Sequence, residues 1–195
     1  VLFADTALRV GTKLAAASTT DNPIVRDAWG RPFLPGSTLK GAVRMAVERL
    51  VPTLNLPGVR SCGMATGSRI DCVSVQEGRR REAQELSDGA LAEFLSEHTC
   101  TTCRLFGSQV QAGRTSFADL AADPGWEAPA ELRDGAPIDR DTERAYERRR
   151  FDYEVVAAGT PFRCEIAAEN ISDPELGLLA IGVLGAQAGL DADPT

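Results

Sequence analysis

The segment at residues 35–44, PGSTLKGAVR, constrains the fold of this chain more than any other. Its proline and glycine end an extended run, and the Ser37 or Thr38 hydroxyl is suited to cap a helix by accepting a hydrogen bond from a free backbone N–H. Apolar residues then recur at helical spacing as far as Pro52, which is expected to end the helix. The pattern predicts an amphipathic helix over about residues 39–51 with one face buried.

Two cations lie in the first two turns of this helix. Lys40 and Arg44 are four residues apart and share a face, at the end where the helix dipole already places partial positive charge. Such cations suit an anion that binds the exposed N–H groups. The alternative is a pair of solvated side chains on the polar face. The position favours an anion site formed by Ser37, Thr38, Lys40 and Arg44.

Composition places the chain among soluble globular proteins. Its 195 residues are 43% hydrophobic and 25% charged, which predicts one domain with a sizeable core. Because it has neither a membrane-length apolar run nor a secretory leader, we expect a cytoplasmic protein with no membrane partner. The net charge of −7 argues against nucleic acid, but the arginines are clustered enough to form a local basic strip.

Four of the five cysteines lie in one weakly apolar segment. Cys100 and Cys103 form a Cys-x-x-Cys pair, and a tetrahedral thiolate site needs two more ligands from elsewhere in the chain. Cys62 and Cys72 are available, with His98 as an alternative, and a bound ion would stabilise such a segment. We expect structural Zn²⁺ on the four cysteines. Ordinary buried thiols are the alternative, and a redox pair is less favoured because the motif does not follow a strand at a helix start.

Hydrophobic patterning predicts the remaining elements. We expect helices that begin near Ser87 and Ser172, a largely irregular stretch over residues 53–86, and a turn at residues 28–30 supported by Asp27. Strands are expected over residues 1–10, 113–120, 151–156 and 161–167. In the last helix, the side chains expected to face inward are Leu176, Leu179, Ala180, Val183 and Leu184.

The order of these motifs resembles that of one protein family. The ordered set is specific although each motif alone is weak. It consists of DNPIVRD at residues 21–27, FLPGSTLKG at 33–41 with Arg44, CTTCRLFG at 100–107, GRTSFAD at 113–119, IDR at 138–140 and EVVAAGTPF at 154–162. Together they resemble the RAMP superfamily of CRISPR-associated proteins, and most of all the repeated backbone subunit of type III effector complexes.

The resemblance and the order of elements imply an α+β fold. We expect a single RAMP domain over residues 1–195 with a ferredoxin-like (RRM-like) split βαβ core. The core would carry a zinc-binding insertion at about residues 53–110 and a thumb-like β-hairpin at about residues 121–150. The usual last strand is absent from the expected order, because the chain stops after the second helix.

The resemblance implies binding to guide CRISPR RNA and cleavage of paired target RNA, in a complex where RAMP subunits stack head to tail. Asp21 matches the aspartate needed for cleavage in the backbone subunits. There it would orient water on Mg²⁺ or Mn²⁺, or help to activate a ribose 2′-hydroxyl. On sequence alone, an aspartate before Asn22 and Pro23 is also a common turn residue. The residues implied to bind RNA are Arg26, Ser37, Thr38, Lys40, Arg44, Arg140 and Arg144.

Two other functions stay open at the level of the sequence. A RAMP subunit can be purely structural and hold guide RNA without cleaving anything. RAMP proteins that process guide precursors often use histidine, and the single histidine of this chain, His98, lies beside the cysteines. We therefore rank precursor processing third.

Overall fold

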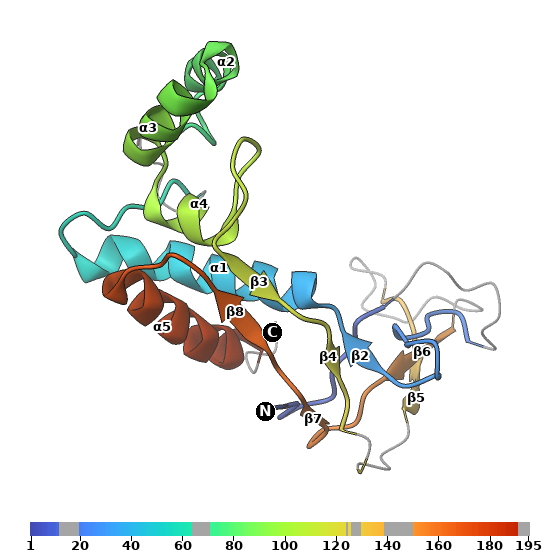
Figure 1. The fold of residues 1–195 in the computed structure, drawn as a ribbon. Coiled ribbons are helices and arrows are strands. Elements are labelled where there is room, and N and C mark those ends of the chain that lie inside the picture. Colours follow the sequence, from blue (N-terminus) through green and yellow to red (C-terminus); the bar gives the residue numbers. More distant parts are fainter. Residues whose placement is uncertain (12–19, 64–70, 124, 126–129, 139–149, 191–195) are drawn as a thin grey trace. The chain divides into compact units, whose positions relative to one another are not determined.

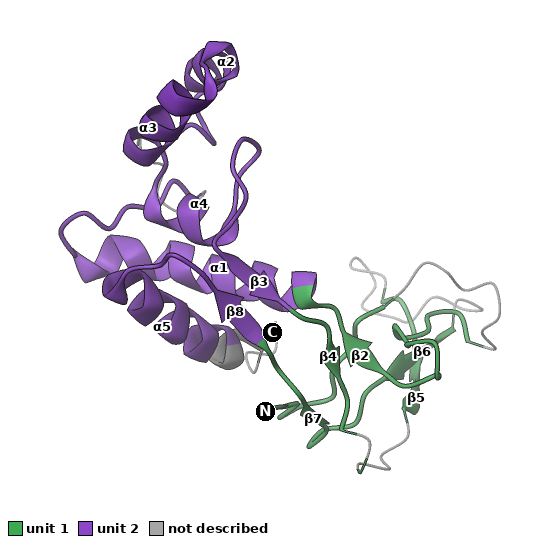
Figure 2. Ribbon diagram, in the orientation of Figure 1, with its two compact units in different colours: residues 1–36, 118–165 green, residues 37–117, 166–195 purple. Residues whose placement is uncertain are grey.

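The computed structural model describes residues 1–11, 20–63, 71–123, 125, 130–138 and 150–190. The chain divides into two compact units (Figures 1 and 2). Unit 1 comprises residues 1–36 and 118–165, and unit 2 comprises residues 37–117 and 166–195.

Unit 1 is built from short antiparallel strand pairs. β1 (Leu2–Phe3) pairs with β7 (Pro161–Phe162), β2 (Phe33–Leu34) with β4 (Leu120–Ala121), and β5 (Glu131–Gly135) with β6 (Phe151–Val155). The prediction of one strand over residues 1–10 is wrong, because only β1 and an isolated bridge from Leu8 to Val156 form there. β5 lies within the segment at about residues 121–150 for which a thumb-like β-hairpin is predicted, and residues 139–149 of that segment lie outside the described residues.

The predicted turn at residues 28–30 is confirmed. Arg26 bridges Pro32, and the Asp27 carboxylate accepts the N–H groups of Trp29 and Arg31, each at 2.9 Å. Its other oxygen accepts from the Arg31 side chain at 2.8 Å, and Gly30 supplies a positive φ of 79°. Asp27 therefore supports the turn, as the sequence predicts.

Unit 2 contains five helices and one strand pair among its described residues. Their bounds are α1 (Gly36–Leu54), α2 (Glu77–Glu85), α3 (Asp88–His98), α4 (Thr101–Phe106), β3 (Thr115–Phe117), β8 (Ile166–Ala168) and α5 (Asp173–Leu190). β3 and β8 pair antiparallel, with Ser116 opposite Ala167. The predicted strands at 113–120 and 161–167 are thus each divided between the two units, as β3 with β4 and β7 with β8.

Helix α1 buries the face that the sequence predicts. Leu39, Val43, Val47 and Val51 are all buried at four-residue spacing. The helix is longer than expected, since it starts at Gly36 and continues through Pro52 to Leu54. Proline has a helical φ, and near the end of a helix its missing N–H removes little hydrogen bonding.

Helix α2 was missed because its sequence shows no apolar periodicity. Only Ala83 of its nine residues is buried. Ion pairs stabilise its surface instead: Arg81 with Glu77, and Arg79 with both Glu82 and Asp71. Helix α3 follows Ser87 as predicted.

Helix α5 buries a different face from the predicted one. Leu179 is buried and Val183 is half-buried, but Leu176, Ala180 and Leu184 are exposed. Gly182 lies against α1, where an added Cβ would be 2.5 Å from a Val47 methyl. Beyond its first turn α5 is apolar on nearly every side, so its periodicity selects no face.

The architecture is mixed α and β, in agreement with the predicted class. Within the described ranges the named strands form four two-stranded pairs rather than one continuous sheet. The ferredoxin-like arrangement accordingly stays a prediction.

Candidate functional site

Four cysteines converge in unit 2. Cys100 is the N-cap of α4, Cys103 lies in its first turn, and Cys62 and Cys72 come from the preceding segment. Their sulfur atoms all lie within 4.8 Å of one another. Cys72, Cys100 and Cys103 are fully buried and Cys62 is partly exposed. Four clustered thiols fit the ligand number and chemistry of a tetrahedral Zn²⁺ site.

Hydrogen bonds among these thiols shift their ionisation in opposite directions. The neighbouring thiols of Cys100, Cys103 and Cys62 hold the pKa of Cys72 well below its ordinary value. A bond from Cys103 lowers the pKa of Cys100 to about 7. The pKa values of Cys62 and Cys103 are raised, chiefly by the interaction of each thiol with Cys100. The proximity of the four sulfurs thus lowers the pKa of two of the thiols, and the thiolate is the form that binds metal.

Two glycines keep the chain after Cys103 close to α4. Gly107 has a φ of 91°, and its N–H donates to the Cys103 carbonyl at 2.9 Å. At Gly113 an added Cβ would lie 2.6 Å from the Phe106 carbonyl carbon, so only glycine fits. This contact gives a physical reason for the glycines at the two ends of residues 107–113.

His98, the alternative ligand, makes different contacts. Its Nδ1 lies 3.0 Å from an Asp71 carboxylate oxygen, and its ring lies 4.5 Å from that of Phe94. The geometry therefore favours the four cysteines as the ligand set. The motif opens α4, but α4 follows α3 and not a strand, in agreement with the argument against a redox pair.

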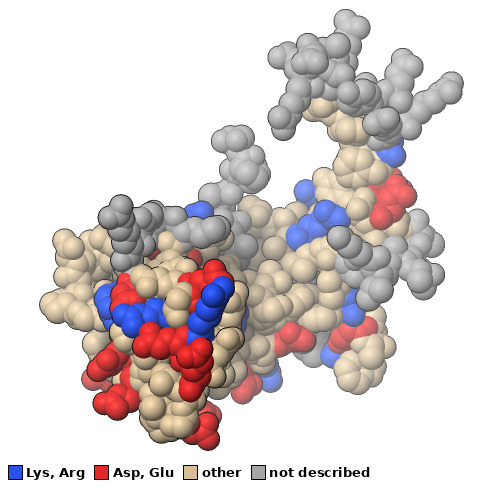
Figure 3. Space-filling view, turned by 90° about the horizontal axis from the view of Figure 1, so that it is seen from above, with Lys and Arg blue, Asp and Glu red and all other residues tan. Residues whose placement is uncertain are grey.

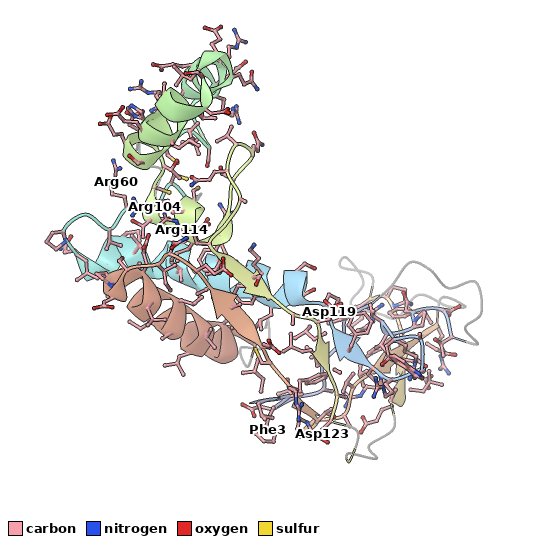
Figure 4. The ribbon with its side chains drawn as sticks, in the orientation of Figure 1. Phe3, Arg60, Arg104, Arg114, Asp119 and Asp123 are labelled. Carbon is pink, nitrogen blue, oxygen red and sulfur yellow. The ribbon has the colours of Figure 1, made fainter. Side chains whose placement is uncertain are left out.

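A carboxylate of the protein itself already binds a backbone N–H at the start of α1. The Asp119 carboxylate accepts the Gly36 N–H at 2.8 Å (Asp119 is labelled in Figure 4). Ser37 and Thr38 are exposed, and the Lys40 ammonium donates to the Thr115 carbonyl at 3.3 Å. One of the N–H groups expected to await a ligand is thus already bonded. Sequence reasoning missed Asp119, the last residue of the GRTSFAD motif, because it lies 83 residues from Gly36.

Arg44 is bonded inside the protein. Its Nε donates to Glu48 at 2.8 Å and its Nη1 to the Gly107 carbonyl at 3.0 Å. Its Nη2 lies 3.8 Å from the Cys103 sulfur. The structure thus brings Arg44 to the cysteines, which the sequence did not predict.

In unit 1 the segment at residues 21–26 runs beside β6. Asp21 is exposed, and its carboxylate accepts the Asp152 N–H at 3.3 Å. Arg26 pairs with Glu154 at 3.3 Å and donates to the Gly30 carbonyl at 2.9 Å. Arg140 and Arg144 lie outside the described residues.

On the face shown in Figure 3, basic side chains are interleaved with acidic ones rather than gathered into one patch of a single sign. The ion pairs of Arg79 and Arg81 with neighbouring carboxylates are of this kind. None of the helices in the described ranges is both long and apolar enough to cross a bilayer.

Comparison with known sequences identifies the family. A sequence model of the RAMP superfamily matches residues 4–181, so this chain belongs to that superfamily. Over 30 residues the chain is also 60% identical to the CRISPR system Cms endoribonuclease Csm3 of Methanocaldococcus jannaschii. That match covers 15% of this chain and 12% of the relative.

Proposed function

We propose that this chain is a guide-RNA-binding backbone subunit of a type III CRISPR ribonucleoprotein that cleaves complementary target RNA. The observation that carries the proposal is the 60% identity over 30 residues to an endoribonuclease named Csm3, within a chain that belongs to the RAMP superfamily. Its partners would be guide RNA, target RNA and other RAMP subunits stacked head to tail, in the cytoplasm.

The start of α1 is the proposed contact for guide-RNA phosphates. Ser37 and Thr38 are exposed there, and the Lys40 ammonium has donors to spare beyond its bond to the Thr115 carbonyl. Arg26, Arg140 and Arg144 are proposed to add contacts. Guide–target pairing would supply sequence specificity, with the protein contacting the backbone.

Asp21 is the proposed residue for target cleavage. Its carboxylate is exposed, and its bond to the Asp152 N–H fixes it beside β6. In the proposed transesterification, a ribose 2′-oxygen forms a bond to the adjacent phosphorus while the bond to the 5′-oxygen breaks. The proton leaves the 2′-hydroxyl and the 5′-oxygen gains one. Asp21 would take the first proton or position Mg²⁺ or Mn²⁺, which would polarise the phosphate.

A structural Zn²⁺ is proposed for Cys62, Cys72, Cys100 and Cys103. The convergence of the four sulfurs within 4.8 Å supports it, as does the burial of three of them. The ion would join α4 to the segment that follows α1, where there is little other apolar core.

The second candidate is a structural RAMP subunit that holds guide RNA without cleavage. The hydrogen bond that the Asp152 N–H donates to Asp21 favours this candidate, because a purely structural aspartate would accept the same bond.

The two candidates are separated by Asp21→Asn, which keeps an acceptor for the Asp152 N–H and removes the charge. We expect cleavage by the assembled complex to fall about a hundredfold or more, because general-base and metal-positioning roles each contribute at that level. Guide binding should be unchanged. The measurement is cleavage of matched RNA with Mg²⁺ or Mn²⁺, repeated with chelator.

Asp5→Asn, at an exposed carboxylate of unit 1, is the control. Equal cleavage by wild type and Asp21→Asn would place the chemistry elsewhere, and an inactive wild type would favour the structural subunit.

A further inference from the structure

Two side chains from different segments donate to one sulfur of the cysteine cluster. The Ser74 hydroxyl donates to the Cys103 sulfur at 3.0 Å, and Arg44 Nη2 approaches the same atom at 3.8 Å. Cys103 is fully buried, so the sulfur that these donors contact is itself shielded from water.

The guanidinium of Arg44 is held in place by its other bonds. Glu48, one turn along α1, accepts from Nε, and the Gly107 carbonyl accepts from Nη1. Gly107 itself caps α4 by donating to the Cys103 carbonyl. Arg44 therefore contacts both the sulfur and the backbone turn that follows it, which a freely rotating surface arginine would not do.

The charge of a four-thiolate site explains why such donors matter. A divalent ion with four thiolates carries a net charge of −2, and burying that charge is costly unless it is compensated. Donors in the outer shell orient ligands and stabilise the thiolate form, and their loss typically weakens metal binding 10- to 100-fold.

We propose that Arg44 is a positioning residue of the metal centre, acting with Ser74 on the Cys103 thiolate, rather than a phosphate ligand. This inference rests on the proposed zinc site. It also links that site to α1: the helix whose first turn is proposed to contact RNA holds the metal centre through Arg44.

The test compares zinc affinity, by chelator competition, in wild type, Arg44→Gln and Ser74→Ala. We expect 10- to 100-fold weaker binding in Arg44→Gln and a change in the same direction in Ser74→Ala. In Co²⁺-substituted protein, the sulfur-to-metal charge-transfer bands should shift in both variants. Arg49→Gln, at an exposed arginine of the same helix, is the matched control and should equal wild type.

The outcomes separate this inference from the metal site itself. A wild type that binds no stoichiometric zinc would overturn both. A zinc-binding wild type with equal affinity in Arg44→Gln and Arg49→Gln would overturn only the role of Arg44. If Arg44→Gln then also reduced the salt dependence of RNA binding, Arg44 would be assigned to phosphate. Ser74→Ala leaves α1 intact, so the test can be carried out even if the Arg44 variant misfolds. An unchanged zinc affinity in Ser74→Ala would overturn the claim that donors outside the four cysteines hold the Cys103 thiolate.

Discussion

At the scale of single residues, the buried carboxylate of Glu175 shows how local and distant contacts combine. It is only 4% exposed, and it accepts both the N–H and the hydroxyl of Ser172 at 2.9 Å, so that Glu175 caps the start of α5 as in one half of a capping box. Arg104 of α4, labelled in Figure 4, donates to its other oxygen at 3.2 Å. Glu175 therefore joins α5 to α4.

Glu175 predicts a loss of stability in acid. Burial raises the pKa of this carboxyl, but the bonds from Ser172 and the charges of Arg104 and Arg114 outweigh burial and lower it below 4.5. Its stabilising contribution is present above the unfolded-state pKa and is lost as the pH falls through the folded-state value. We expect Glu175→Gln to cost about 1–2 kcal/mol at pH 7. The cost should shrink as the pH falls through the lowered folded-state pKa, where the wild-type carboxylate becomes protonated.

Urea unfolding of the wild-type chain and of Glu175→Gln at several pH values measures this difference in the free energy of unfolding. Glu169→Gln, at an exposed carboxylate of the same unit, serves as the control. A cost for Glu175→Gln that did not change with pH would show that the charge of Glu175 contributes nothing.

At the scale of elements, α1 combines two proposed roles on one helix. Its first turn carries Ser37 and Thr38, exposed beside a Gly36 N–H that Asp119 already caps. Its next turns carry Lys40 and Arg44, of which Arg44 contacts the Cys103 sulfur of the cysteine cluster. Lys40 is thus the cation of α1 best placed for a phosphate.

We expect Lys40→Ala to weaken guide-RNA binding and reduce the slope of log affinity against log salt by roughly one unit, because one phosphate contact releases about one counterion. Sequence preference should not change. Filter or anisotropy titrations over a range of salt concentrations give the slope. Arg49→Ala, on the same helix, should retain the wild-type slope, and an equal slope in Lys40→Ala would leave Lys40 as a solvated side chain.

At the scale of the whole molecule, the proposed metal centre belongs to one unit only. Its four ligands all lie in unit 2, where the described segment between α1 and β3 contains the small buried clusters around Cys72 and around Val73. A segment with so little apolar core would depend on the proposed metal for folding.

We therefore expect zinc removal to act on unit 2 alone. Chelation should lower the melting temperature, because a ligand bound only to the folded state stabilises it by mass action. Hydrogen exchange should accelerate in α2, α3 and α4 and stay unchanged in β5 and β6. A non-chelating isomer of the same reagent is the control, and equal acceleration in both units would contradict a local structural role.

Local spacing in the sequence determined the features that depend on near neighbours. The buried face of α1, the turn held by Asp27 and the starts of α3 and α5 follow from residue types within about one helical turn or one tight turn of each other. The four-cysteine set was also predicted, because thiols are rare enough for their clustering along the chain to be informative.

Contacts between distant segments were decided only by the tertiary structure. The bond from Gly36 to Asp119 spans 83 residues and the contact of Arg44 with Cys103 spans 59, and no spacing rule pairs such positions. The exposed side of α5 was equally undetermined, since a helix that is apolar all round has no preferred face until another surface packs against it. The sequence thus predicted candidate residues for an anion or a metal. Only the tertiary structure brought Arg44 of α1 to the Cys103 sulfur of α4, because a side chain bonds whichever partner the fold brings within reach.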